Sequence, residues 1–274
     1  MKNNKIKTGI LGLIAIFLLL FFIFPVIWFL LTSFQTKAVS SSPGFHLFFK
    51  PTLENYQNVF SKLNFLVFFK NSLIIGIIST IIAVVISSLA AYSFSRYKSK
   101  FTYNLSFWIL SNRMLPPIAI VAPLYLLMSK LSLLDTYPGI ILAYCAANIP
   151  YAVWMLITFF QEIPYSLDEA GIIDGCSKLQ VLSRIVIPLA KPGILATGIF
   201  IFVLSWSEFL VALMLTSTQT KTLPVAIAAF VNDRGIEWGN MAAAGTVVLF
   251  PLAVLFYSIQ KHLIRGLTYG AVKG

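Results

Sequence analysis

The chain has 274 residues, of which 58% are hydrophobic and 11% are charged. A soluble domain carries about 25% charged residues, so this composition excludes an ordinary soluble core and indicates an all-α integral membrane protein. The formal net charge of +11 comes from basic residues scattered singly among apolar runs. That pattern lacks the basic stripe of a nucleic-acid-binding surface, and anionic membrane lipid is the partner that it favours.

The first apolar run covers residues 10–31 and follows a short basic tail at residues 1–9. At 1.5 Å per residue, about 20 helical residues cross a hydrocarbon core of about 30 Å. The run is longer than the apolar region of a signal peptide, which has about 7–15 residues. We therefore predict an uncleaved first span with a kink at Pro25, which neighbouring helices can accommodate.

A mixed polar and aromatic segment, residues 34–69, follows the first span. Within it we predict a loop at residues 40–44, an interfacial segment at residues 45–49 and a short amphipathic helix at residues 53–60. Two interpretations stay open for this segment: it packs against the membrane surface, or it contacts an external protein.

Five further apolar runs predict a protein with six transmembrane helices. The third run is interrupted by the polar and proline-rich residues 112–117. Together the six spans form one transmembrane domain over residues 10–264, and a tail follows at residues 265–274. The second to sixth predicted spans cover residues 71–94, 101–131, 137–160, 193–215 and 241–264.

Six spans place both termini on the same side of the membrane. Of the 20 lysines and arginines, Arg113 lies within a span, twelve lie on the side of the termini and seven lie on the other side. The short loop with Arg96, Lys98 and Lys100 is purely basic. Because basic residues in short loops mark the cytosolic side, we predict a multi-pass protein of the cell membrane with both termini in the cytosol.

One long polar passage, residues 164–180, lies in a loop on that cytosolic side, which we place at residues 162–190. The residues from Ser166 to Glu169, and again from Ser177 to Gln180, fit the capping box of a helix start. Between them Asp174-Gly175 is a turn dipeptide in which glycine takes a positive φ at little cost. The passage therefore predicts a rigid helix-turn-helix that stands out from the membrane.

The same passage contains Glu169-Ala170-Gly171 and Asp174-Gly175, and Pro188 follows. With Trp206-Ser207-Glu208-Phe209 and the final residues 266–274, these motifs resemble ABC transporter permease subunits of the carbohydrate importer type, the maltose-type permeases, including their EAA loop. The resemblance covers essentially the whole chain. This chain departs from the usual pattern in having Gly171 and Cys176 where alanine is common, and Ser207 where asparagine is common.

The resemblance implies that the short helix of the cytosolic loop docks on an ATPase subunit and moves the spans when the ATPase closes. Glu169 also has a local interpretation, in which it reaches back to its own helix start, and Asp174 has one in which it caps the turn. Gly175 has the clearer case, because a positive φ penalises any side chain. The coupling residues predicted in this way are Glu169, Ala170, Ile173, Asp174 and Gly175, with Ala170 and Ile173 as the apolar face.

The sequence contains no phosphate loop of the form G-x-x-x-x-G-K-[ST], no Ser-His-Asp constellation and no metal-ligand spacing. Cys145 and Cys176 are not expected to form a disulfide, and His46 and His262 are too far apart to suggest a metal site. We therefore expect no enzymatic activity and no cofactor on this chain. The resemblance implies that two separate ATPase subunits bind ATP and Mg²⁺, and that a second homologous permease and an external solute-binding protein complete the assembly.

Two charged residues lie within predicted spans, where a charge is costly and usually faces protein or a water-filled cavity. Arg113, beside Asn112, either lines the transport pathway or a gate, or forms a structural ion pair or extends to the cytosolic interface. Glu208, with Trp206, either contacts a sugar or fixes helix packing, with Arg113 as a possible partner. The candidates for the pathway or the substrate site are Asn112, Arg113, Trp206 and Glu208.

The function implied by the resemblance is that of a permease subunit that forms half of the pathway for a sugar or sugar derivative. It would couple closure of the ATPase to alternating access, and the tail at residues 265–274 would lie against the ATPase dimer. The alternative is a self-sufficient, ion-driven secondary transporter or channel that uses Arg113 and Glu208. A membrane-embedded enzyme ranks lower, because it needs a cluster of polar residues at one depth. The sequence does not name the solute.

Overall fold

The computed structural model describes residues 2–62, 64–233 and 235–269. The chain divides into two compact units, of which the first combines Met1–Leu66 with Ala226–Pro251 and the second combines Val67–Val225 with Leu252–Gly274. Residues 270–274, which include the end of the predicted tail, lie outside the described part of the chain. The preceding residues of that tail continue the last helix as far as Tyr269.

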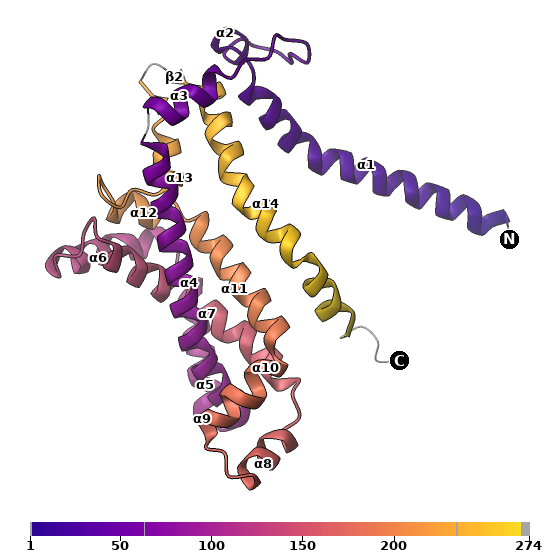
Figure 1. The fold of residues 1–274 in the computed structure, drawn as a ribbon, viewed down its shortest axis with the longest axis vertical. Helices are drawn as coiled ribbons and strands as arrows, with labels where there is room; N and C mark the ends of the chain where they lie inside the picture. The colour runs from indigo at the N-terminus through magenta and orange to yellow at the C-terminus, as the bar shows by residue number, and fades with distance from the viewer. Residues whose placement is uncertain (1, 63, 234, 270–274) are drawn as a thin grey trace. The chain divides into compact units, whose positions relative to one another are not determined.

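Four helices of the described chain are long and apolar enough to cross a membrane, and six spans result if each of two bent helix pairs counts as one. The four are α1 (Lys2–Ser33), α4 (Phe65–Arg96), α7 (Tyr137–Gln161) and α14 (Trp238–Tyr269), which Figure 1 labels. The prediction of an all-α membrane protein is therefore confirmed. The fourth predicted span agrees with α7 to within one residue, whereas α1, α4 and α14 extend beyond the predicted ends.

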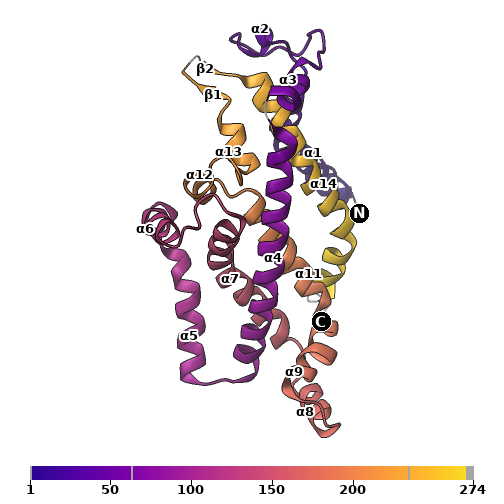
Figure 2. The ribbon, with the colours of Figure 1, turned by 60° about the vertical axis from the view of Figure 1, so that its left-hand side comes forward.

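The third predicted span is not one straight helix. It consists of α5 (Lys100–Ser111), the 3-10 turn η1 (Asn112–Met114) and α6 (Pro117–Lys130), and the two parts meet at 97°. Figure 2 shows α6 turning away from the end of α5. The bend follows from Pro116 and Pro117, because each proline lacks an N–H and disfavours the α conformation in the residue before it.

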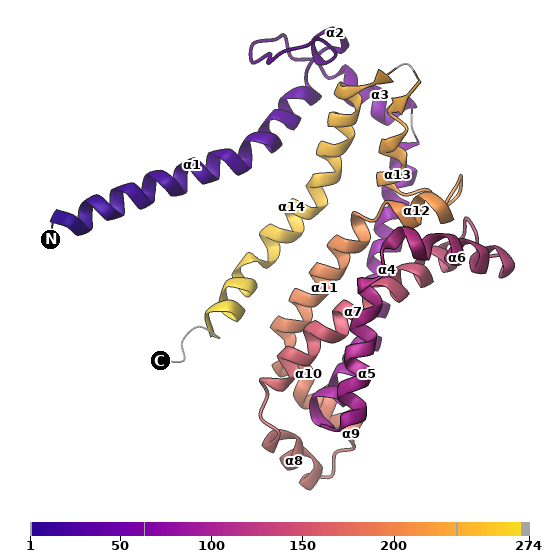
Figure 3. The same ribbon diagram turned by 180° about the vertical axis from the view of Figure 1, so that it is seen from behind.

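The fifth predicted span, residues 193–215, is also wrong as a continuous helix. α11 (Lys191–Trp206) ends at Trp206, and α12 (Leu210–Leu215) begins after a break of three residues. On its other side α11 meets the loop at residues 162–190 at 83°, as the run from α8 to α11 in Figure 3 shows. That loop contains α8 (Ser166–Ile173), α9 (Lys178–Val181), the π-helical segment η2 (Leu182–Val186) and α10 (Ile187–Leu189).

The first unit contains most of the polar and aromatic segment that follows α1. The predicted amphipathic helix is confirmed as α3 (Glu54–Lys62), and a short helix α2 (Lys37–Ser40) precedes it. Asn55 of α3 donates through Nδ2 to the backbone oxygens of Ser33 and Gln35, at 2.9 and 2.7 Å, and so ties α3 to the end of α1. A helix α13 (Leu223–Ala228) and a hairpin of β1 (Val231–Asn232) and β2 (Gly235–Ile236) precede α14.

The core of the second unit lies in two main clusters along its helices. One joins α4, α6, α7 and α12 through Ile75, Met128, Tyr144 and Leu215. The other joins the C-terminal ends of α4 and α7 to the π-helical segment, with Phe160 and Val186 fully buried. The loop at residues 162–190 packs on this second cluster.

Candidate functional site

The short helix α8 lies at the tip of the loop at residues 162–190, as Figure 1 shows at its lower end. Its start differs from the prediction, because Tyr165 occupies the N-cap position and supplies no side-chain hydrogen bond, while Ser166 is already helical. The backbone N–H groups of Leu167 and Asp168 donate to the oxygens of Pro164 and Tyr165. The chain therefore turns into the helix before Ser166, and the predicted capping box at Ser166, with Glu169 reaching back, is wrong.

The end of α8 agrees with the prediction of a sharp turn at Gly175. Gly175 has φ +85°, and its N–H donates to the oxygen of Ile172 at 3.0 Å. The N–H of Cys176 donates to the oxygen of Gly171 at 2.9 Å, which completes the Schellman pattern of a helix C-terminus. Asp174 is the C-cap residue and contributes its backbone N–H.

The second predicted capping box is confirmed at the start of α9. The N–H of Gln180 donates to Ser177 Oγ, and the N–H of Ser177 donates to Gln180 Oε1 at 2.8 Å. The end of α8 and the start of α9 thus lie on either side of Gly175, and their backbone groups have hydrogen-bond partners. The turn between α8 and α9 is therefore held by local hydrogen bonds at both of its ends.

A buried ion pair joins α8 to the C-terminal end of α4. Asp168 is 1% exposed, and both of its oxygens accept from Arg96: Nε to Oδ2 at 2.9 Å and Nη2 to Oδ1 at 3.0 Å. The Tyr92 hydroxyl donates to Oδ2 at 2.9 Å, and Arg96 Nη1 donates to the backbone oxygens of Phe160 and Ile163 at 3.1 Å each. A fully hydrogen-bonded pair of this kind fixes orientation as well as position.

Our sequence analysis did not identify this pair. Arg96 counted there as a basic residue beside a membrane span, and Asp168 as part of a helix start. They lie 72 residues apart, so no local pattern links them. The one available signal was an aspartate in the first turn of a helix that no serine caps.

The five residues predicted to couple to an ATPase are all exposed: Glu169, Ala170, Ile173, Asp174 and Gly175. Ile173 is 85% exposed, which is unusual for a large apolar side chain on a helix outside the predicted spans. The opposite face of α8 is buried through Asp168 and Gly171. α8 therefore has one anchored face and one free face, and Ile173 lies on the free one.

Gly171, at a position where the motif that this loop resembles commonly has alanine, permits a close approach. A Cβ at this position would lie 2.6 Å from Ile185 Cδ1 and 3.2 Å from Val181 Cγ2. The glycine thus lets α8 pack directly on the π-helical segment, whose Ile185 occupies the space of the missing methyl group. The replacement is compensated by packing rather than simply loosening the helix.

A second, exposed contact joins α9 to the end of α4. The Nζ atom of Lys178 donates to the Tyr97 hydroxyl and lies 4.9 Å from the centre of the Tyr97 ring. The hydrogen bond to Tyr97 raises the pKa of the Lys178 ammonium. Because the group is exposed, the contact adds little stability.

Arg113 lies in the 3-10 turn η1 at the bend of the third span. Its Nη2 donates to Asn148 Oδ1 of α7 at 3.3 Å, and its guanidinium carbon lies 4.1 Å from the centre of the Tyr151 ring. Its Nε is buried without a hydrogen-bond partner among the described residues. The predicted alternative that Arg113 pairs with Glu208 is wrong.

Glu208 instead lies in the break between α11 and α12. Its Oε1 accepts from the N–H of Val211 at 2.8 Å, and its backbone oxygen accepts from the Tyr144 hydroxyl at 3.4 Å. Trp206 is 2% exposed and packs on Phe69 and Phe202, so its ring is not available to stack on a sugar in this conformation. These contacts give Glu208 a role in ending and restarting a helix.

Asn112, the remaining pathway candidate, is exposed and donates through Nδ2 to the backbone oxygen of Trp108 at 3.1 Å. The structure thus brings Arg113 together with Asn148 and Tyr151, two residues that the sequence analysis did not select. It does not bring together Asn112, Arg113, Trp206 and Glu208.

At the opposite end of the second unit, Asp135 organises the loop at residues 216–222. Oδ1 and Oδ2 of Asp135 accept from the backbone N–H groups of Ser217, Thr218, Gln219 and Thr220 at 2.9–3.0 Å. Burial alone would raise the pKa of this carboxyl, but the N–H donors of Gln219, Ser217 and Thr220 outweigh it and hold the pKa well below its ordinary value.

Asn71 of α4 forms hydrogen bonds with the same loop. Its Nδ2 donates to the backbone oxygens of Gln219 and Lys221, at 2.9 and 3.0 Å, and its Oδ1 accepts from the Tyr137 hydroxyl at 2.7 Å. One helix, α4, therefore contacts the loop at residues 162–190 at one end and the loop at residues 216–222 at the other.

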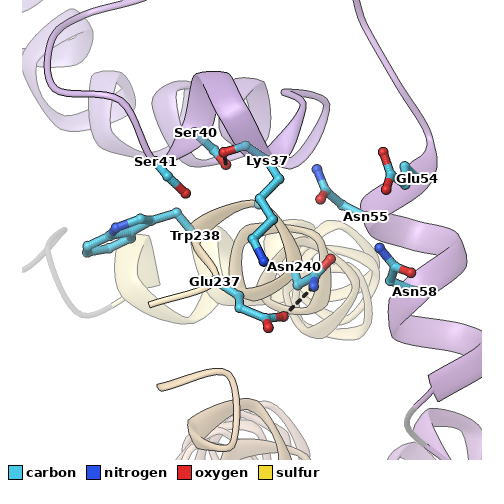
Figure 4. Close-up of a pocket in the computed structure, with 10 residues that line it drawn as sticks. Lys37, Ser40, Ser41, Glu54, Asn55, Asn58, Glu237, Trp238 and Asn240 are labelled. Atoms are coloured by element: carbon cyan, nitrogen blue, oxygen red, sulfur yellow. Dashed lines mark hydrogen bonds between the residues drawn. The ribbon is translucent and has the colours of Figure 1, made fainter. Parts of the chain in front are cut away.

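The first unit has a small polar cavity of about 40 Å³ between α2, α3 and the start of α14 (Figure 4). Asn240 donates to Glu237 Oε2 at 2.6 Å, and Figure 4 shows Lys37 pointing toward these two side chains. A volume of this size holds one or two water molecules. It is too small for a saccharide, so it is not a substrate site.

A comparison with protein families finds one match over residues 83–269, to the family described as binding-protein-dependent transport system inner membrane component. The chain is 36% identical to the trehalose/maltose transport system permease protein MalG of Thermococcus litoralis, with 100% of both chains covered. It is 35% identical to the sulfoquinovosyl glycerol transport system permease protein SmoH of Agrobacterium fabrum, with 92% of this chain and 89% of the relative covered.

Among solved structures, the chain is similar to one from a bacterial ABC transporter involved in the import of the acidic polysaccharide alginate. The TM-score is 0.79 at 20% identity, over 95% of this chain and 98% of that chain. At this identity the likeness establishes the fold and says nothing of the solute.

Proposed function

We propose, from the premise that this chain belongs to the family of inner-membrane components of binding-protein-dependent transport systems, that the solute it helps to import is a sugar or a sugar derivative. The chain is the permease subunit of an ATP-binding-cassette importer. The relatives at 35–36% identity are named for the transport of trehalose, maltose and sulfoquinovosyl glycerol, which supports a saccharide as the solute. Family membership does not favour the ion-driven alternative.

The proposal includes partners. ATP and Mg²⁺ bind to two separate ATPase subunits, since the sequence has no phosphate loop. A second homologous permease forms the other half of the pathway, and an external protein delivers the solute. A related fold has been solved with a periplasmic solute-loaded protein bound, which supports the last of these partners.

The proposed topology places both termini and the loop with α8 in the cytosol. It rests on the excess of lysines and arginines on that side and agrees with the need for α8 to meet an ATPase. The transmembrane permease domain extends over residues 10–264 in this proposal, with tails at residues 1–9 and 265–274.

The observation that supports the coupling role best is the two-sided character of α8. Its buried face is anchored to α4 by Arg96 and Asp168, and its free face presents Ile173, which is 85% exposed. A lever needs a stiff attachment and an accessible end, and α8 has both. We therefore assign docking on the ATPase to Glu169, Ala170, Ile173, Asp174 and Gly175.

The test is co-purification of the permease with its ATPase in mild detergent. Ile173→Asp should lose the ATPase, because it places a charge in an apolar contact, while the permease stays folded because the residue is exposed. Ser183→Asp is the matched control, an exposed position of the same loop outside α8. Equal retention of the ATPase by wild type and Ile173→Asp would contradict the docking role.

A further inference from the structure

A row of polar side chains crosses the second unit at one depth. Arg113 of η1 bonds to Asn148 of α7, and Asn148 Nδ2 donates to Ser205 Oγ of α11 at 2.9 Å. Ser79 of α4 lies 3.4 Å from Ser205 Oγ. Asn148 and Ser205 are each 5% exposed, and Ser79 is 1% exposed. Four spans thus contribute one polar group each to a connected row.

The row lies near the middle of the membrane. α5 starts at Lys100 on the basic side, and its 12 residues rise about 18 Å before Arg113, at 1.5 Å per residue. Asn148 lies 11 residues after the first residue of α7 and 13 before the last. In a hydrocarbon core of about 30 Å, both positions are far from lipid headgroups.

Arg113 is a cation without an anion. Its contacts are the Asn148 amide and the Tyr151 ring, its Nε has no hydrogen-bond partner, and no carboxylate of the described chain pairs with it. Arg96 of the same chain shows the alternative, with a bidentate aspartate and two carbonyl oxygens. A charge within a span is costly and is retained where it meets protein or a water-filled pathway.

The guanidinium N–H groups of Arg113 that form no hydrogen bond with the described chain suit one class of ligand. A guanidinium presents its N–H groups as a planar fork that fits a carboxylate or another oxyanion through two parallel hydrogen bonds. Tyr151 holds the guanidinium plane by a cation–π contact. Asn148 is bound to Ser205 on one side and Arg113 on the other, so the fork is kept at a fixed depth.

We propose that Arg113, positioned by Asn148 and Tyr151, is a mid-membrane contact for the anionic group of an acidic saccharide, a carboxylate or a sulfonate. This inference rests on the proposed sugar-import function and narrows its solute class. The irregular backbone of η1 agrees with it, since non-helical backbone at membrane depth occurs where it is buried in protein or lines a cavity.

The experiment uses the assembled importer, with its partner subunits and binding protein, in proteoliposomes. Uptake of a uronic acid trisaccharide and of maltotriose is measured for wild type, Arg113→Gln, Arg113→Lys and the neighbour control Met114→Leu, at a 77% exposed position of η1. We expect wild type to import the acidic sugar. Arg113→Gln should reduce that uptake by about tenfold or more, as loss of one charge-assisted hydrogen-bonded pair implies, with Arg113→Lys intermediate and Met114→Leu unchanged.

Cysteine labelling shows whether the position faces the pathway. In a Cys176→Ser background, Arg113→Cys should react with a charged, membrane-impermeant thiol reagent, and the acidic trisaccharide should slow the reaction more than maltotriose does. Trp154→Cys, at a 56% exposed position of α7, is the lipid-facing control and should not react. The native Cys145 is buried, so the parent protein should give no signal.

Several results would overturn the proposal. One is wild-type uptake of maltotriose alone, and another is acidic uptake that is the same in Arg113→Gln as in wild type. An Arg113→Cys thiol that is unreactive with and without ATP would mean that the partner permease covers Arg113 and supplies its anion. Failure of the sugar-import function itself looks different, because then neither trisaccharide is imported by wild type.

Discussion

Asp168 and Asp135 are two carboxylates that anchor loops at opposite ends of the second unit, and their charges are balanced in different ways. Asp168 is buried and neutralised by the guanidinium of Arg96. Asp135 is partly exposed and is surrounded by backbone N–H groups of residues 217–220. The anchor at Asp168 therefore depends on a second side chain far away in the sequence, whereas the anchor at Asp135 depends on the conformation of one loop.

This difference matches what each loop has to do in the proposed mechanism. A movement of α8 must be transmitted to a membrane span, and a bidentate ion pair joins α8 directly to α4. The loop at residues 216–222 has to keep its own conformation, and a carboxylate at its centre achieves this. Arg113 is the third case, a cation that the described chain leaves without a counter-ion.

The largest expected effect comes from removing the partner of Asp168. Arg96→Ala leaves a buried carboxylate uncompensated, which costs about 3–5 kcal/mol, so the amides of α8 should lose protection in hydrogen exchange. Arg96→Lys keeps the positive charge but lacks the planar fork of the guanidinium. The protection of α8 in this variant should therefore lie between that of wild type and that of Arg96→Ala. Arg184→Ala, at an exposed position of the same loop, is the control. Full protection of α8 in Arg96→Ala would show that the ion pair does not hold it.

Two glycines sharpen the comparison at the level of the backbone. A Cβ at Gly139 would lie 2.1 Å from the backbone oxygen of Leu133, whereas one at Gly175 would meet open space. Gly139→Ala should cost about 1–3 kcal/mol through overpacking. Gly175→Ala should cost about 1 kcal/mol through its positive φ alone. Thermal unfolding of the purified protein measures both, and the reverse order would contradict the packing described for Gly139.

The effect of Asp135 should be smaller and dependent on pH. Its pKa is lower in the folded chain than in the unfolded one, where it is about 3.9. The stabilisation is therefore complete above that pH and is lost as the pH falls toward the lower folded value. Asp135→Asn should cost about 1 kcal/mol at neutral pH, since the site is partly exposed. The protection factors of the amides at residues 217–220, which correct for the intrinsic pH dependence of exchange, should be lower in this variant and should no longer decrease as the pH falls. A variant that keeps the acid dependence would assign it to another group.

The smallest effect is expected at Lys178 and Tyr97. The pKa of Lys178 is raised in the folded protein, so its contribution is present below the ordinary lysine pKa of about 10.4 and is lost only as the pH rises through the higher value. Because the pair is exposed, Tyr97→Phe should leave the melting temperature and transport unchanged at neutral pH. A clear loss of transport would mean that this contact, rather than Arg96, is the main anchor.

Local patterns predicted the parts of the coupling loop that local hydrogen bonds hold. Gly175 has the expected positive φ, and Ser177 and Gln180 form the expected capping box. The box at Ser166 was wrong because Pro164 and Tyr165 already start the helical turn. Four membrane spans were predictable from apolar length, since about 20 such residues suffice to cross a bilayer, whereas the breaks in the predicted third and fifth spans were not.

The long-range features could not be predicted in the same way. The ion pair of Arg96 with Asp168 joins residues 72 apart, and the contact of Arg113 with Asn148 joins residues 35 apart. The break after Trp206 contains no proline or glycine, and Tyr144 and the carboxylate of Glu208 stabilise it. Prolines at residues 116 and 117 signalled an interruption but not its 97° angle, and the packing of α6 against the distant α12 had no local signal.

The most direct test of the central claim measures transport and ATP hydrolysis together, in proteoliposomes that contain the assembled importer. Asp168→Asn keeps the shape of the side chain but removes the charge that holds α8 to α4, and Glu162→Gln makes the same change at an exposed position of the loop. Our account predicts that Asp168→Asn still binds the ATPase through its exposed face, while the solute imported per ATP hydrolysed falls several-fold and Glu162→Gln stays at the wild-type ratio. An unchanged ratio in Asp168→Asn would contradict the claim that this anchor transmits ATPase closure to the membrane spans.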